Sequence, residues 1–228
     1  MSRDQPPRRS QVPGSRAVAA RRGEEYICAM STSAEIAVPD RIMTFDEFRA
    51  ETVPKEAGRF ELWDGRVVVR KGPAGSINAE RSQHWEMKAA LYRVLLTAVV
   101  SSGIKAHVVP EGARVRMPPG HGGVEPDAFV YLGPEVEPES LVVPEPVIVC
   151  EVLSPSTAKH DMSAKLEGHF ALESIQHYSI ADPDKPMLIV HSRQPDGTLA
   201  TRLLSDPAAT LRLDPPGLTV SLAEVLAG

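Results

Sequence analysis

The sequence predicts a mixed α/β or α+β fold in which helices pack against a central sheet. Three observations predict it. Helical and strand-like patterns follow one another in mixed order, without strict alternation. The run PVIVCEVL is apolar at nearly every position, as expected of a central strand whose two faces are both covered. Residues 78–100 carry apolar side chains at helical spacing, over a length suited to a packing helix.

The chain has 228 residues and is 42% hydrophobic, which is enough for one substantial core. We expect residues 39–228 to form that domain. Residues 1–38 are rich in Pro, Arg and Ser and show no sustained periodicity, so they are predicted to be a disordered extension. Met30 offers an internal start, which leaves open whether residues 1–29 belong to the native protein.

Charge is distributed unevenly along the chain. The formal net charge is -5, but residues 1–22 hold six Arg and one Asp, so the remainder carries 19 basic and 29 acidic residues, a net charge of -10. A domain with this net negative charge does not offer a general binding surface for phosphates. Any contact with nucleic acid must come from a local site or from the Arg-rich residues 1–22.

Cysteine content and hydropathy indicate the compartment. Cys28 and Cys150 cannot build a disulfide framework, and Cys150 lies inside an apolar run, where a thiol behaves as a small hydrophobic group. No apolar run is long enough to span a bilayer, and the Arg-rich start lacks the apolar stretch of a secretory signal. We therefore expect a soluble, cytoplasmic protein with no membrane partner.

Ordered structure is expected to begin at MTFDEF. Thr44, followed three residues later by Glu47, has the form of a capping box that opens a short helix to about residue 51. The stretch RFELWDGRVVVR then predicts two strands joined by a turn at Asp64 and Gly65. The long helix over 78–100 follows. We expect both Trp63 and Trp85 to be core residues.

The second half of the chain is predicted to supply most of the sheet. Short strands are expected at 105–109 and 112–117, and longer ones in VEPDAFVYL and EPVIVCEVL, with a Pro- and Glu-rich loop between them. A helix is predicted over 159–173. The segments HYSIAD, MLIVHS, TLATRLL and TLRL have the pattern of strands, and a short terminal helix is expected near Leu222.

Two carboxylates interrupt these apolar strands. An ionised Glu151 inside PVIVCEVL costs several kcal/mol unless it is paired, hydrogen-bonded or bound to a cation. An ordinary salt bridge, or a strand end that reaches water, is the simpler explanation. Asp127 borders the run in VEPDAFVYL, and if the two strands are neighbours both acids can converge at one end of the sheet. Two such oxygen ligands suit Mg²⁺, which rarely takes a full cage of protein ligands.

Asp161 and Lys165 lie four residues apart in the predicted helix that follows. This spacing fits a surface ion pair worth a few tenths of a kcal/mol. It also fits a lysine that reaches back to the carboxylates, where its ammonium would orient a water or stabilise a developing oxyanion. Spacing does not decide between the two interpretations.

A family resemblance joins these motifs. The segments FELWDGRVV, EPDAFV, VCEVLSPSTAKHDMSAKLEGHF and IQHYSIADP, with the helix that carries His84, resemble the Uma-type putative restriction endonuclease family, a bacterial branch of the PD-(D/E)XK nuclease superfamily. The resemblance covers roughly residues 43–190. It implies a restriction-endonuclease-like fold, with a central mixed sheet flanked by helices.

The resemblance also implies roles for individual residues. Asp127 and Glu151 would be the metal-binding acids and Lys165 a migrated catalytic lysine, because Leu153 occupies the position of the lysine in the standard motif. Glu61 matches an early acidic position, and is either a further metal ligand or a surface charge on the hairpin.

Three further residues are weaker candidates for this site. His169 stands where relatives usually have Tyr. His84 fits a family position, yet a single helical histidine is more often packed or solvated than a ligand. Asp161 is the third of these candidates, because it shares a helical face with Lys165.

The implied function is Mg²⁺- or Mn²⁺-dependent hydrolysis of phosphodiester bonds in DNA by an endonuclease. A homodimer is compatible with it, since enzymes that cut both strands are commonly dimers. The alternative is a nuclease-like module that binds nucleic acid or protein without cutting. The net charge of -10 and the absence of lysine at position 153 favour that alternative. An unrelated structural protein gives no reason for a carboxylate at Glu151.

Overall fold

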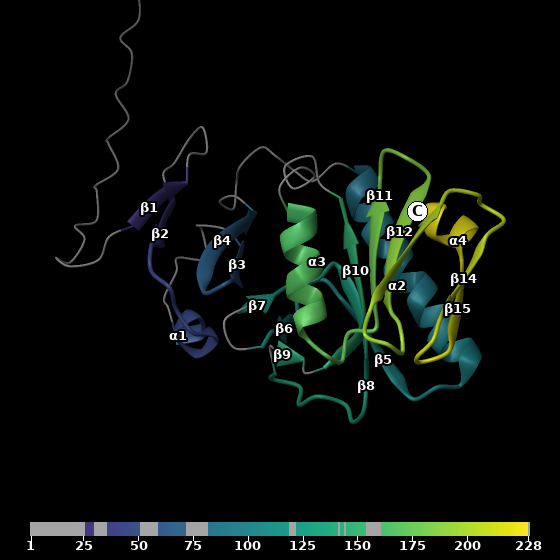
Figure 1. Cartoon of the computed structure of the whole chain (residues 1–228), viewed down its shortest axis with the longest axis horizontal. Helices are drawn as coiled ribbons and strands as arrows, with labels where there is room; N and C mark the ends of the chain where they lie inside the picture. Colours follow the sequence, from purple (N-terminus) through teal and green to yellow (C-terminus); the bar gives the residue numbers. More distant parts are fainter. Residues whose placement is uncertain are drawn as a thin grey trace, which may run out of the picture.

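The computed structural model describes residues 26–29, 36–50, 59–71, 82–118, 122–140, 142–143, 145–153 and 161–227. A six-stranded sheet lies at its centre (Figure 1). Across the sheet the order is β13 (Leu199–Leu204), β12 (Met187–Arg193), β11 (His177–Asp182), β10 (Pro146–Val152), β8 (Ala128–Leu132) and β5 (Ala106–Pro110). Strands β10 and β11 are parallel and all other neighbours are antiparallel. The predicted mixed α/β fold class is confirmed.

Strand β10 lies inside this sheet, between β8 and β11, and all seven of its residues are buried. Ile148 and Val149 point to opposite faces and are both 0% exposed. Burying each such side chain stabilises the fold by about 1.5–3 kcal/mol. The expectation of a central strand covered on both faces is therefore confirmed. The chain passes from β10 to its parallel neighbour β11 through the helix α3 (Asp161–Ala171).

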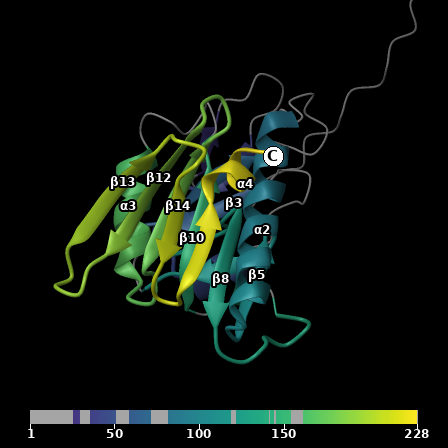
Figure 2. The same ribbon diagram turned by 90° about the vertical axis from the view of Figure 1, so that its right-hand side faces the viewer.

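One face of the central sheet is covered by α2 (Ser82–Ser102) together with a unit from the end of the chain. That unit consists of β14 (Thr210–Leu213), β15 (Leu218–Ser221) and α4 (Leu222–Leu226). Figure 2 shows β14, β15, α4 and α2 in front of the sheet. Apolar side chains of all these elements share one hydrophobic cluster with the sheet.

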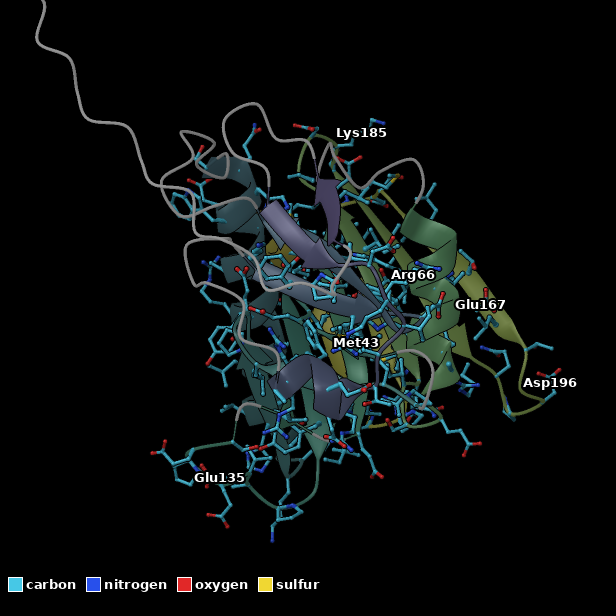
Figure 3. The ribbon with its side chains drawn as sticks, turned by 90° about the vertical axis from the view of Figure 1, so that its left-hand side faces the viewer. Met43, Arg66, Glu135, Glu167, Lys185 and Asp196 are labelled. Carbon is cyan, nitrogen blue, oxygen red and sulfur yellow. The ribbon has the colours of Figure 1, made fainter. Side chains whose placement is uncertain are left out.

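The opposite face is covered by α3 and by a second, five-stranded sheet. Its order is β4 (Arg66–Lys71), β3 (Arg59–Trp63), β7 (Gly123–Val124), β6 (Arg114–Arg116) and β9 (Val142–Val143). Side chains of β6, β7 and β9 form a cluster with the central sheet, against which residues of α3 pack. Figure 3 looks onto this side of the molecule, where Met43, Arg66 and Glu167 are labelled.

The predicted hairpin and capping box are both confirmed. Asp64 and Gly65 have φ angles of 48° and 72°, the left-handed conformation that a two-residue hairpin turn requires. Before α1 (Phe45–Ala50), the Glu47 amide donates to Thr44 Oγ1 and the Thr44 amide donates to Glu47 Oε2. The bonds with Thr44 lower the pKa of the Glu47 carboxyl. Helix α1 then packs Phe45 and Phe48 into a third apolar cluster, with Phe60 and Leu62 of β3.

The other predicted elements match within a few residues where the structure describes them. The long helix is described from Ser82 to Ser102, two residues beyond the predicted end at 100. Residues 78–81 of the predicted helix lie outside the described residues. Helix α3 covers 161–171 of the expected 159–173, and 159–160 are likewise not described. Strands β5 and β6 match the short strands expected before residue 118, and β11–β14 and α4 match the predicted C-terminal elements.

Three features differ from expectation. The second sheet, with its two-residue strands β7 and β9, was not predicted. Within the segment predicted to be disordered, β1 (Tyr26–Ala29) pairs antiparallel with β2 (Ile36–Pro39). The prediction that Trp85 is a core residue is wrong, because its side chain is 52% exposed. His84, Met87 and Leu91 define the buried face of α2, and Trp85 lies on the outward side of that helix. Trp63 is half-buried and packs against the cluster shared with α3.

Candidate active site

The two strands that carry the predicted acids are neighbours. Strands β8 and β10 pair antiparallel, with Cys150 opposite Ala128. Continued by one residue, this register places Asp127 beside Glu151 at the end of the pair. The Asp127 carboxylate also ties the strands together, because its Oδ2 accepts the Val152 amide at 2.7 Å. The condition for both acids to meet at one end of the sheet is therefore met.

Glu151 is buried and faces two side chains of α3. It is 4% exposed, and its Oε2 lies 3.6 Å from Lys165 Nζ. Its Oε1 lies 3.8 Å from His169 Nε2. Lys165 and His169 are four residues apart, so one face of the helix directs both toward the carboxylate. Lys165 is itself 6% exposed, so it is not the solvated member of a surface pair.

The ring of His169 is fully buried among aromatic side chains. It meets Trp63 edge-on at 5.6 Å and lies tilted against Tyr178 at 4.5 Å between ring centroids. The neighbouring Gly168 has no side chain, and a Cβ there would overlap the Trp63 ring. Glycine thus allows α3 to approach β3 closely, which brings Lys165 and His169 within reach of Glu151.

Asp127 has a cationic partner that the sequence analysis missed. Lys88 of α2 places its Nζ 3.1 Å from Asp127 Oδ1 and 3.1 Å from Glu111 Oε2. The Lys88 side chain is 11% exposed and Asp127 only 1%. One signal was present in the sequence: Lys88 lies between Met87 and Leu91, on the buried face of the long helix.

Glu61 is also buried, at 2% exposed. Its Oε1 accepts the Glu125 amide at 2.9 Å, and its Oε2 accepts Trp63 Nε1 at 3.0 Å. The interpretation of Glu61 as a hairpin surface charge is therefore wrong, since the side chain points from β3 into the molecule. Glu61 connects β3 to the segment that leads into Asp127.

The weaker candidates are placed as follows. His84 is buried on α2, and its Nε2 lies 3.3 Å from the carbonyl of Val152, which follows Glu151. Since a carbonyl only accepts, this hydrogen bond requires the proton on Nε2. Asp161 begins α3, but its side chain lies outside the described residues, so its pairing with Lys165 stays a prediction.

The chemical type of the available ligands, carboxylate oxygens, fits a hard divalent cation. Asp127 and Glu151 offer carboxylate oxygens from adjacent strands, and Mg²⁺ commonly takes one or two carboxylates and completes its shell with water and phosphate oxygens. Among the described residues no three His, Cys, Asp or Glu side chains are grouped closely enough to hold a metal ion. A cation here would therefore be held by few protein ligands.

Comparisons with known proteins identify the family of the chain. Residues 45–223 match the model of the Uma2 family, described as putative restriction endonuclease. The chain belongs to this family. The matched range contains every residue of the candidate site. The comparison with curated proteins found no match.

A solved structure shows that the fold is shared. The crystal structure of a putative nuclease of DUF820 from Anabaena variabilis superposes with a TM-score of 0.60 at 19% sequence identity. The match covers 81% of this chain and 98% of the other. This Uma2-family chain thus has a nuclease-like fold. None of the helices in its described segments combines the length and apolarity needed to cross a membrane.

Proposed function

We propose that this Uma2-family protein is a divalent-metal-dependent endonuclease that hydrolyses phosphodiester bonds in DNA. The observation that carries the proposal is Glu151, a buried carboxylate on an interior strand with a lysine ammonium 3.6 Å away and Asp127 at the start of the neighbouring strand. A buried ion pair adds little to stability, because well-packed apolar residues at the same positions stabilise a fold as well or better. Stability alone therefore does not explain Glu151. The family description and the printed name of the structural neighbour support the same activity.

In this proposal Asp127 and Glu151 hold the cation, Mg²⁺ or Mn²⁺. Glu61 is not grouped with them closely enough to be a third ligand, and its two oxygens accept the Glu125 amide and Trp63 Nε1. When bound, such an ion lowers the pKa of a coordinated water and offsets negative charge on the phosphate. The Val152 amide fixes Asp127, and the pairing of the two strands fixes the spacing of the two acids. His169 approaches Glu151 Oε1 and leaves its Oε2 facing Lys165.

Lys165 supplies the positive charge on the protein side. Its ammonium orients the attacking water or stabilises the charge that builds on the phosphate oxygens in the transition state. In the standard motif a lysine two residues after the second acid has this role. Here Leu153 occupies that position and is packed against the apolar cluster, and α3 brings Lys165 to the same acid instead.

One observation favours the alternative of a nuclease-like module that binds without cutting. Both acids already lie beside ammonium groups, Asp127 beside Lys88 and Glu151 beside Lys165. Such pairing neutralises the buried charges without a metal ion.

The test is cleavage of supercoiled plasmid and single-stranded DNA in Mg²⁺ or Mn²⁺, with a chelator as control. Wild type is expected to cut, and Glu151→Gln and Lys165→Met to lose activity by at least roughly 100-fold. Glu167→Gln is the matched control, because Glu167 is an exposed carboxylate of the same helix (Figure 3). Absence of cutting by wild type, or unchanged cutting by Glu151→Gln, would overturn the proposal in favour of the binding module.

A further inference from the structure

Lys88 is a second, largely buried lysine beside the proposed metal acids, and it contacts two carboxylates at once. Its Nζ is 3.1 Å from Asp127 Oδ1 and 3.1 Å from Glu111 Oε2. The two carboxylates differ in environment, since the Asp127 side chain is 1% exposed and that of Glu111 is 28% exposed. The ammonium therefore bridges an interior acid and an acid with access to solvent.

Charge makes this bridge relevant to cation binding. A buried aspartate needs a positive partner, and Lys88 provides one for Asp127. Two cations that share one carboxylate repel each other, and they do so strongly where the dielectric constant is low. Lys88 and a divalent cation therefore compete for Asp127. Glu111 gives the ammonium a second carboxylate at the same distance, so that it can leave Asp127 and remain paired.

We propose that Lys88 is a positioning residue that pairs with Asp127 when no cation is bound and moves onto Glu111 when Asp127 becomes a ligand. The inference rests on the proposed function, because it takes Asp127 as part of the metal site. The flexible four-carbon stem of lysine and its compact charge suit this move, which needs only a small displacement between two oxygens already in contact.

The mechanism predicts opposite effects for two substitutions. Lys88→Met removes the competitor and is expected to tighten cation binding. Glu111→Gln removes the second partner, holds the ammonium more firmly on Asp127 and is expected to weaken binding. Coupling between adjacent sites typically amounts to about 5–150-fold in affinity, so each shift should reach at least about fivefold. A lysine that only supports the fold would change stability without shifting the affinity for the cation.

The experiment is calorimetric titration of wild type, Lys88→Met and Glu111→Gln with Mg²⁺ and with Mn²⁺, in the absence of DNA. Glu135→Gln is the control, an exposed carboxylate in a loop at the lower end of the molecule in Figure 3. Circular dichroism first establishes that each variant is folded. Should Lys88→Met fail to fold, Glu111→Gln carries the test, and unchanged or tighter binding in that variant overturns the inference.

The outcomes separate this inference from the proposed function. Opposite shifts in the two variants support the role of Lys88. Cation binding and DNA cleavage by wild type, with equal affinities or shifts of the same sign in the variants, overturn the role of Lys88 and leave the nuclease in place. Wild type that neither binds a cation nor cuts DNA overturns the proposed function, and the inference with it.

Discussion

Lys165→Met tests the buried ion pair on which the candidate site depends. The substitution removes the ammonium that faces Glu151 and keeps much of the length of the side chain. At 3.6 Å and an effective dielectric constant of about 20, the two charges attract by roughly 4–5 kcal/mol before desolvation is counted. Both side chains are less than a tenth exposed, so the substitution leaves a buried carboxylate without this partner. Breaking such a pair typically costs about 3–5 kcal/mol of unfolding free energy.

For a chain of this size that loss lowers Tm by roughly 6–20 °C, which thermal unfolding followed by circular dichroism measures readily. The control is Lys185→Met, because Lys185 is 70% exposed and lies 4.0 Å from Asp182, an arrangement worth less than about 1 kcal/mol. Adding Glu151→Gln to Lys165→Met should recover part of the loss, since no uncompensated charge is then buried. Equal effects of the two lysine substitutions would refute the reasoning.

Three further predictions concern packing and protonation. Gly168→Ala should lower Tm and change the tryptophan fluorescence, because a Cβ there overlaps the Trp63 ring; an unchanged spectrum and Tm would count against the close approach of α3. Burial raises the pKa of the Cys150 thiol to about 12, so in the Cys28→Ser variant a thiol reagent should react only after unfolding, and rapid reaction of the native protein would contradict this. Burial lowers the pKa of His177 in the folded state. The contribution of neutral His177 to the free energy of unfolding is therefore fully present above the unfolded-state pKa of about 6.5. It is lost as the pH falls through the pKa of the folded state. Urea unfolding between pH 7.5 and 5 should show that loss in wild type and a smaller one in His177→Gln.

The strands that position the acids were predictable because local pattern determines them. A continuous apolar run indicates an interior strand, and a carboxylate within it stands out, as Glu151 does. Proline before Asp127 marks the start of a strand. The sequence does not show whether the two strands are neighbours, because strand pairing depends on contacts between residues far apart in the chain. In the structure the two strands pair antiparallel.

The cationic partner of Asp127 was not predictable by the same reasoning. Periodicity assigns a charged residue to the solvent side of a helix, whereas the long apolar stem of Lys88 lies along the buried side and carries its ammonium to the carboxylates. Glu111 carries no signal, since it follows β5 in a turn, where acidic residues are ordinary. Helical spacing places Lys88 near the buried face, but its pairing with Asp127 and Glu111 comes from tertiary contacts.

The second sheet was missed for a different reason. Strands β7 and β9 have two residues each, too few to show any periodicity. They exist because β6 pairs with both, through contacts such as Val115 with Val124 and with Val143. The same tertiary context decides the burial of Glu61, whose position in a predicted hairpin fitted an exposed side chain equally well.

The central claim is that Asp127 and Glu151 together bind a divalent cation, and the most direct measurement is calorimetric titration of wild type and Glu151→Gln with Mg²⁺ or Mn²⁺. Glu167→Gln is the control with the same change of charge at an exposed position. Wild type and the control should both show saturable binding, and Glu151→Gln should bind the cation at least about tenfold more weakly. Absence of binding by wild type, or equal affinity in Glu151→Gln, would contradict the central claim and leave Glu151 as a structural acid paired with Lys165.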